Sequence, residues 1–164
     1  MARKSAVLIP VIIAAAAIGS LGVAFVPAEV RESDRTQFSK GTVRIGDEAI
    51  TVEIADTAAE RQRWLTFRQD RLPEDSALLI KYDHPDLYEV WMLNIEYNLD
   101  LIWFDMEGNA VYLIEDAPPC QNVVETVSCT YKTTAPALYV MASTAGFIDA
   151  HEISKGSKMT IISV

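Results

Sequence analysis

The sequence predicts a mainly β fold of the α+β class: a compact antiparallel sheet curled into a partial barrel, with one or two short helices, preceded by one transmembrane helix. Three observations lead to this prediction. Seven or eight short apolar runs, separated by turn residues, follow residue 41. A clear helix-start signal stands before one segment, and an uncharged run of 21 residues lies near the N-terminus. Short strands at close spacing are typical of a curled antiparallel sheet.

The N-terminal segment is predicted to be a membrane anchor. Arg3 and Lys4 precede residues 6–26, which carry no charge. A helix of this length would measure roughly 31 Å, enough to cross a hydrocarbon core of about 30 Å. The apolar core of a signal peptide usually has only about 7–15 residues. A retained anchor is therefore favoured over a signal cleaved near Ala24 or Ala28.

The charges beside this segment predict its orientation. Basic residues precede it and a mixed, acidic stretch follows it, so residues 1–5 are expected in the cytoplasm. The protein is then a single-pass membrane protein with its domain outside the cell, or a secreted protein if the segment is a cleaved signal.

Residues 27–40 are polar and aperiodic, which predicts a linker before a β-rich domain at 41–164. The domain opens with two alternating runs, 42–45 and 49–55, around the turn residues Gly46 and Asp47. This pattern predicts a β-hairpin.

The following segment is predicted to be a helix from Ala58 to Leu65. Thr57 and Glu60 form a capping box, in which the threonine hydroxyl accepts from the amide of Glu60 and the carboxylate reaches back. The later apolar runs predict five strands, at 77–82, 88–93, 99–105, 110–115 and 137–143. One or two helical turns are predicted at 145–153, and a final strand at 158–164.

A series of motifs in this order resembles the family known as "domain of unknown function 192". The residues that carry the resemblance are Val52–Asp56, Arg61, Leu65, Phe67-Arg68, Leu72–Asp75, Trp91-Met92 with Asn94, Leu99-Asp100, Phe104-Asp105 with Gly108, Pro119-Cys120, Cys129, Tyr131, Tyr139-Val140 and Ala145–Phe147. The resemblance covers about residues 43–164. It implies a small β-rich domain, secreted or membrane-anchored, with no agreed activity, and the paired cysteines resemble the archaeal branch.

The chain departs from the family pattern at four places. The family usually has Gly-Leu-Met where Trp64-Leu65-Thr66 stands, and Gly-Met-Leu where Ala77-Leu78-Leu79 stands. It has a lysine where Leu93 stands and a proline where Asn98 stands. A family pocket that depends on the missing lysine or glycine is therefore in doubt here.

The charge of the domain argues against nucleic acid as a partner. Residues 27–164 hold all 23 acidic residues but only 12 of the 14 basic ones, and such a surface repels phosphate backbones. The exception is a group of four arginines, at positions 61, 63, 68 and 71. They could form ion pairs with the acidic segments, or one or two could be available to an anionic ligand.

Cys120 and Cys129 are predicted to form a structural disulfide, because disulfides persist outside the cytoplasm. Closing this short ring should stabilise the fold by roughly 2.7 kcal/mol in the chain-entropy model. A metal pair is disfavoured, because neither His84 nor His151 has finger-like spacing from the cysteines. A redox-active or nucleophilic Cys120 remains an alternative.

Other chemistry has little support. The sequence has no nucleophile-elbow motif of hydrolases, no metalloprotease motif and no phosphate-binding glycine loop. The two histidines are predicted to be exposed or capping residues. Asp105, Glu107 and Asn109 alternate as calcium ligands do, but they lack the frame of an EF-hand. No catalytic residue, metal site or cofactor is therefore predicted.

Residues 88–105 combine five aromatic residues with three polar groups, Asn94, Asn98 and Asp100. The rings are expected to be mainly core, and the strand at 99–105 is expected to be central because both of its faces are apolar. A buried Asp100 needs a partner, and Arg61 or Arg68 is the natural choice. Such a pair would be a structural clasp, with Arg61 and Asp100 preferred, or the polar end of a cleft.

The preferred function is binding of a small molecule, a glycan or a protein partner at the cell surface. The candidate ligand-binding residues are Arg68, Trp91 and Asn94, because an aromatic wall, an amide and a guanidinium suit a sugar or a carboxylate. The alternatives are an extracytoplasmic enzyme, a hydrolase or a thiol-redox protein using Cys120, and a surface scaffold without a ligand.

Overall fold

The computed structural model describes residues 38–120, 122 and 128–164. Internal contacts divide the chain into two units, Met1–Thr36 and Gln37–Val164. The first unit lies outside the described residues, and so do the predicted cytoplasmic end, the predicted anchor and nearly all of the predicted linker. Within the described part, no helix is long and apolar enough to cross a membrane.

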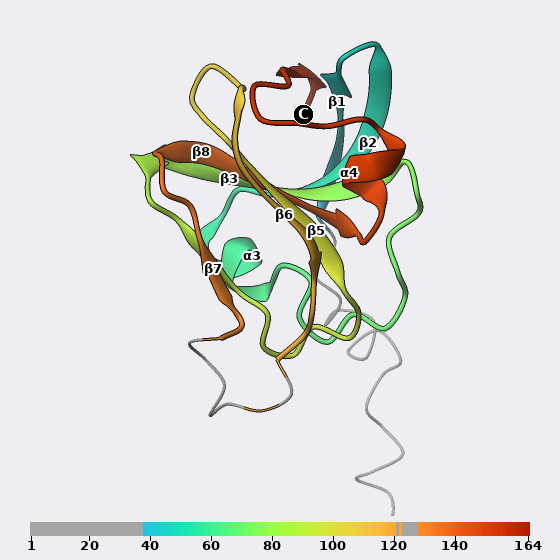
Figure 1. Ribbon diagram of the computed structural model, residues 1–164, viewed down its shortest axis with the longest axis vertical. Helices are drawn as coiled ribbons and strands as arrows, with labels where there is room; N and C mark the ends of the chain where they lie inside the picture. The colour runs from blue at the N-terminus through green and yellow to red at the C-terminus, as the bar shows by residue number, and fades with distance from the viewer. Residues whose placement is uncertain (1–37, 121, 123–127) are drawn as a thin grey trace, which may run out of the picture. The chain divides into compact units, whose positions relative to one another are not determined.

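The second unit is mainly β, as predicted, with a seven-stranded sheet and a separate two-stranded sheet (Figure 1). The large sheet has the order β6-β5-β8-β3-β2-β1-β9. Its strands are β1 (Ser39–Ile45), β2 (Glu48–Ala55), β3 (Ser76–Asp86), β5 (Leu99–Phe104), β6 (Ala110–Ala117), β8 (Ala137–Thr144) and β9 (Met159–Ser163). The helices are α3 (Ala58–Arg63) and α4 (Phe147–Ala150).

The sheet differs from the prediction in one respect. It is not purely antiparallel, because β2 and β3 run parallel while its other neighbouring strands are antiparallel. The sheet does not form a closed barrel: its edge strands β6 and β9 meet only at one corner of the described domain. There Asn109 forms an isolated bridge with Lys158, and the amide of Met159 donates to the carbonyl of Gly108 at 2.7 Å.

The parallel pair results from the helix between its two strands, because parallel neighbours need a crossover connection of a dozen or more residues. The capping box at the start of α3 is confirmed. The hydroxyl of Thr57 accepts from the amide of Glu60 at 3.2 Å, and the Glu60 carboxylate accepts from the amide of Thr57 at 3.0 Å. The helix ends at Arg63, two residues earlier than predicted, because Trp64 leaves the helical conformation with φ 21°.

The core occupies both faces of the central strands. Leu78 and Ile80 of β3 belong to one apolar cluster, and Ala77 and Leu79 belong to the other. All six residues of β5 are buried, with β6 and β8 as its neighbours, which confirms that this strand is central. One cluster is covered by the segment after α3 and by the small sheet, and the other by β1, β2 and α4.

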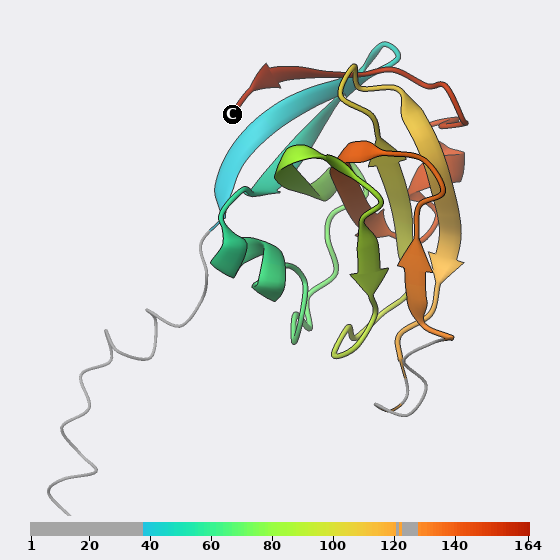
Figure 2. The ribbon, with the colours of Figure 1, turned by 90° about the vertical axis from the view of Figure 1, so that its left-hand side faces the viewer.

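The small sheet pairs β4 (Glu89–Trp91) with β7 (Thr130–Lys132), and Figure 2 shows the two strands side by side. The predicted strand at 88–93 is therefore shorter than expected, and its partner was not predicted. Cys120 and Cys129 form the predicted disulfide, with their Cα atoms 5.5 Å apart. Both cysteines bond to the main chain of Met92. The amide of Cys120 donates to the Met92 carbonyl, and the Met92 amide donates to the Cys129 carbonyl, each at 3.1 Å.

Loss of this disulfide is expected to cost about 2.7 kcal/mol of unfolding free energy, because the open chain regains loop entropy when it unfolds. The measurement is urea denaturation of the chain with and without reductant. The double variant Cys120→Ser/Cys129→Ser is the control, since its unfolding curve should be the same in both buffers. Equal stability of the oxidised and reduced wild-type chain would contradict the prediction.

Candidate functional site

A cleft of about 420 Å³ lies between two parts of the domain that are distant in sequence. One wall comes from α3 and the segment that follows it, and the other from β4 and the turn after it; Figure 2 shows α3 and β4 on opposite sides of this region. The lining residues are Arg61, Gln62, Trp64, Thr66, Phe67, Ile80, Tyr82, Glu89, Val90, Trp91, Leu93 and Asn94. The cleft therefore depends on the tertiary fold.

The cleft exposes two large aromatic side chains. Phe67 is 70% exposed and Trp91 is 40% exposed, whereas Trp64, Ile80 and Val90 are buried and form its apolar base. Exposed rings at a concave, mostly apolar surface are typical of ligand sites. Among the predicted ligand-binding residues, Trp91 and Asn94 line this cleft.

The main chain around the cleft is strained. Within the described residues, five non-glycine residues have positive φ, and three of them, Trp64, Phe67 and Asn94, line this one cleft with φ angles of 21°, 59° and 58°. The amide of Phe67 donates to the carbonyl of Asn94 at 2.7 Å and so joins the two walls. Such conformations cost of order 1–3 kcal/mol each and concentrate at functional sites.

Arg61 lies at one end of the cleft and is held by neighbours. Its guanidinium donates to the carbonyls of Asp56 and Lys81 and contacts the Asp83 carboxylate at 3.5 Å. It also lies 5.5 Å from the centre of the Tyr82 ring. Most of its donors are occupied, so its role at the cleft is to position the surrounding strands and to fill the end of the cavity.

Tyr82 is a neutral phenol at physiological pH. Burial raises its pKa to about 12, with Tyr88 acting in the same direction and Arg61 in the opposite one. The two tyrosine rings stack with their centres 3.4 Å apart. Tyr82 therefore contributes an apolar surface to the cleft and cannot serve as a base near neutral pH.

Arg68, a predicted ligand-binding residue, has a different place. Its guanidinium pairs with both carboxylate oxygens of Glu53 on β2, at 2.5 and 3.2 Å, and its Nε donates to the carbonyl of Asp70. Burial lowers its pKa, but the bonds to Glu53 outweigh this and leave the pKa raised. Arg68 is not among the residues that line the cleft; it fastens the segment after α3 to the sheet.

The predicted clasp between Arg61 and Asp100 is wrong. Asp100 is 2% exposed, and its carboxylate accepts three main-chain hydrogen bonds, from Asp116 at 2.8 Å, Gly146 at 3.1 Å and Ile148 at 2.8 Å. Amide donors at the start of α4 and in β6 satisfy the charge, so no arginine is required. Asp100 is a structural residue on the face of the sheet that α4 covers.

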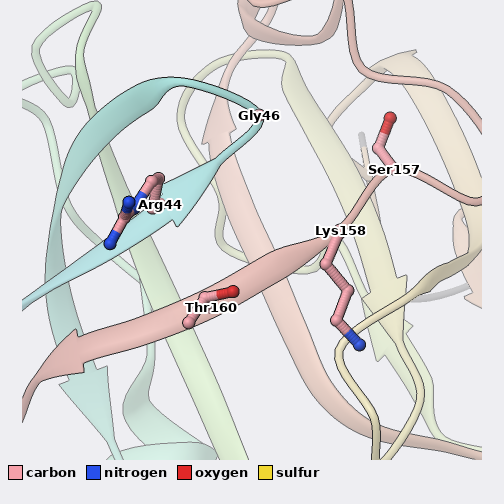
Figure 3. A pocket seen from close by; sticks show the side chains of 5 residues that line it. All are labelled: Arg44, Gly46, Ser157, Lys158 and Thr160. Atoms are coloured by element: carbon pink, nitrogen blue, oxygen red, sulfur yellow. The ribbon is translucent and has the colours of Figure 1, made fainter.

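A second depression, of about 370 Å³, lies on the outer surface where β1 meets β9 (Figure 3). Arg44 and Thr160 are paired across the two strands, and Lys158 stands nearby. The Lys158 ammonium donates to the carbonyl of Glu107 and to Asn109 Oδ1. Figure 3 shows the Arg44 and Lys158 side chains pointing in different directions, so they do not converge on one anion.

The remaining candidates have structural partners. Asp105, considered above as a calcium ligand, accepts from the amide of Asn109 at 2.7 Å and from its side chain at 2.9 Å. His151 bonds to Glu48 through Nδ1 and lies 3.4 Å from the carbonyl of Glu74 through Nε2. In the described part of the chain, no three His, Cys, Asp or Glu side chains are grouped so that they could hold a metal ion.

This chain is similar to one known protein family and to solved structures. The family model DUF192, described as "Uncharacterized ACR", matches residues 41–161. Among curated proteins no match was found.

Two solved structures share the fold. One, from Sinorhizobium meliloti 1021, is described as a "putative transcription regulator"; it is 21% identical with a TM-score of 0.69, over 77% of this chain and 97% of the other. The second, from Novosphingobium aromaticivorans DSM 12444, is described as a protein of unknown function; it is 21% identical with a TM-score of 0.67, over 77% of this chain and 89% of the other. At this identity the likeness shows the fold alone.

Proposed function

We propose, for a chain that belongs to the DUF192 family, that the described domain is a binding module whose ligand occupies the cleft between α3 and β4. The observation that carries this proposal is the exposure of Phe67 and Trp91 at the cleft that also gathers three strained residues. Holding large rings in water and the main chain in costly conformations lowers the stability of the free domain. A ligand that covers the rings would recover part of that cost.

The proposed setting is the outer surface of a cell, with residues 6–26 as a membrane anchor. The uncharged run with Arg3 and Lys4 before it supports this setting. The disulfide between Cys120 and Cys129 supports it independently, because disulfides persist in oxidising compartments and are rare in the cytoplasm. If residues 6–26 are a cleaved signal, the same domain is secreted.

An activity that uses Cys120, hydrolytic or thiol-redox, gains no support from the cleft. The Cys120 sulfur is bonded to Cys129, and neither cysteine lines the cavity. The binding proposal is therefore kept as the single candidate.

A ligand bound at the cleft is expected to raise the melting temperature of the full chain. At one hundred times its dissociation constant it stabilises the folded state by about 2.7 kcal/mol, or roughly 10 °C for a domain of this size. The measurement is a thermal-shift screen with oligosaccharides, small carboxylates and short peptides. Trp91→Ala and Phe67→Asn should abolish the shift given by an active compound.

The controls separate binding from folding. Phe67→Asn should leave the melting temperature of the free chain unchanged or raised, because asparagine tolerates the left-handed conformation of that position. Met106→Ala also removes a large exposed side chain, but from the turn between β5 and β6, and should leave the shift intact. Shifts that survive both cleft variants would refute the proposal, as would a screen without any active compound.

A further inference from the structure

We infer that the partner at the cleft is an extended polypeptide segment, which adds as a third strand to the free edge of β4. This inference rests on the proposed function and names the class of its ligand. It depends on three features of the described domain: the hydrogen-bond phase of the small sheet, the position of the β4 edge in the cleft, and the charge around it.

The phase of the ladder decides which main-chain groups of β4 are free. In an antiparallel pair, residues that exchange hydrogen bonds alternate with residues that do not. The amide of Thr133 donates to the carbonyl of Tyr88 at 3.3 Å, and the amide of Met92 donates to the carbonyl of Cys129 at 3.1 Å. Val90 stands midway between these two positions and therefore bonds to its partner Tyr131.

The same alternation directs the amide and carbonyl groups of Glu89 and Trp91 away from β7. No loop of the described domain bonds to them through its main chain. Both residues line the cleft, and Figure 2 shows β7 on one side of β4 and α3 on the opposite side. The cleft thus contains the open edge of a sheet, with two donors and two acceptors spaced roughly 6.8 Å apart along the strand.

Such an edge matches a polypeptide better than any other ligand class. An extended segment presents main-chain donors and acceptors at the same spacing, and its alternate side chains reach the walls of a groove. Here Phe67 and Trp91 offer apolar surface to one such side chain. A sugar could stack on the rings, but it has no repeat that matches the edge.

The charge around the cleft selects a basic segment. Glu89 lines the cleft and is exposed, and in β3 the cleft residue Tyr82 is followed directly by Asp83, with Asp86 at the end of the strand. Arg61 is the arginine at the cleft, and its guanidinium already contacts Asp83. A peptide with a lysine or arginine two residues from an apolar side chain would complement both the acidic Glu89 and the apolar surface of Phe67 and Trp91.

The test uses the full chain and a synthetic library of acetylated, amidated octapeptides, with lysine fixed at the third position and the fifth position restricted to apolar residues. Binding is measured by fluorescence anisotropy. The best peptide is then methylated at each main-chain nitrogen in turn. Methyl groups on alternate nitrogens should weaken binding at least tenfold, and those between them less than threefold, because only every second amide faces β4.

Proline variants of the protein provide a second test. Glu89→Pro removes one donor from the free edge without removing a bond to β7, and should weaken peptide binding at least tenfold. Lys132→Pro is the matched control, because Lys132 is the partner of Glu89 and its amide points away from β4 on the far side of the small sheet. It should leave binding unchanged, and Glu89→Gln, which keeps the donor, should weaken binding less than Glu89→Pro. The melting temperature of each variant shows that it is folded; if Glu89→Pro unfolds, the methylation pattern decides alone.

Failure of this inference is distinguishable from failure of the proposed function. If methylation weakens binding without a period of two, or if oligosaccharides bind in a Trp91-dependent way while no peptide binds, the strand-addition model is refuted and the ligand cleft stands. If neither peptides nor oligosaccharides nor carboxylates bind, both are refuted.

Discussion

Asp100→Ala is expected to destabilise the domain by about 4 kcal/mol, because it leaves three main-chain amides without an acceptor, of which the amide of Ile148 is buried and the other two are partly buried. Each orphaned donor costs about 1–3 kcal/mol, and bonds to a charged acceptor lie at the upper end of the usual range. The affected amides belong to Asp116, Gly146 and Ile148. The loss therefore reaches both β6 and the start of α4, and should lower the melting temperature by about 15 °C.

Asp105→Ala is the matched control, since it also removes an aspartate that accepts two hydrogen bonds, both from Asn109. Its turn is partly exposed, so water can replace the lost acceptor and the cost should be about 1 kcal/mol. Urea denaturation of both variants measures the difference. Equal losses would mean that Asp100 is not the buried acceptor described above.

Gly108→Ala is the second variant with a large expected effect, a loss of about 3 kcal/mol. Gly108 has φ +84°, and an added Cβ would lie 2.3 Å from the carbonyl oxygen of Met159. The left-handed conformation costs roughly 1–2 kcal/mol for a residue with a side chain, and relief of the main-chain clash adds about 1–3 kcal/mol. The clash lies at the corner where β6 and β9 meet.

Gly156→Ala separates these two contributions. Gly156 has φ +92°, but no atom lies within 4 Å of an added Cβ. It should therefore lose only the conformational part, about 1–2 kcal/mol. Thermal denaturation of both variants gives the comparison, and equal melting temperatures would show that β6 and β9 can separate at the corner without cost.

The local elements of the fold could be predicted because their causes are local. The apolar run of β5 indicated a strand buried on both faces, the alternation around Gly46 and Asp47 indicated the hairpin, and the capping box indicated α3. The parallel pairing of β2 and β3 was missed. Strand direction depends on where the chain returns after α3, and no residue in either strand encodes it.

The error at Asp100 has a general physical reason. When only the sequence is known, a buried carboxylate suggests an arginine or lysine as its partner, because these residue types can be identified directly in the sequence. Main-chain amides are equally good partners, but every residue carries one, so the sequence does not mark them. The pairing of Arg68 with Glu53 was missed for a related reason, since Glu53 lies fifteen residues earlier on β2.

The candidate site was only partly visible in the sequence. Trp91 and Asn94 stood in an unusual mixture of aromatic and polar residues, and both line the cleft. Phe67 and Glu89 were missed, because exposure and the free edge of a strand are tertiary properties. The sequence held one signal of the strained main chain at the cleft. Trp64 stands where the family pattern has glycine, and Trp64 has a positive φ of 21°, which glycine adopts more readily than other residues.

The pairing of β1 with β9 determines how the domain responds to mechanical force. These strands are antiparallel neighbours, and Thr42 near the start of one lies opposite Ser163 at the end of the other. Tension applied between the first and last described residues would therefore pull on a single hydrogen bond at a time, starting from this end. A sheet loaded in this way unzips at low force, whereas strands pulled along their length must break all of their bonds together. The strand β9 would therefore be the first to detach under load.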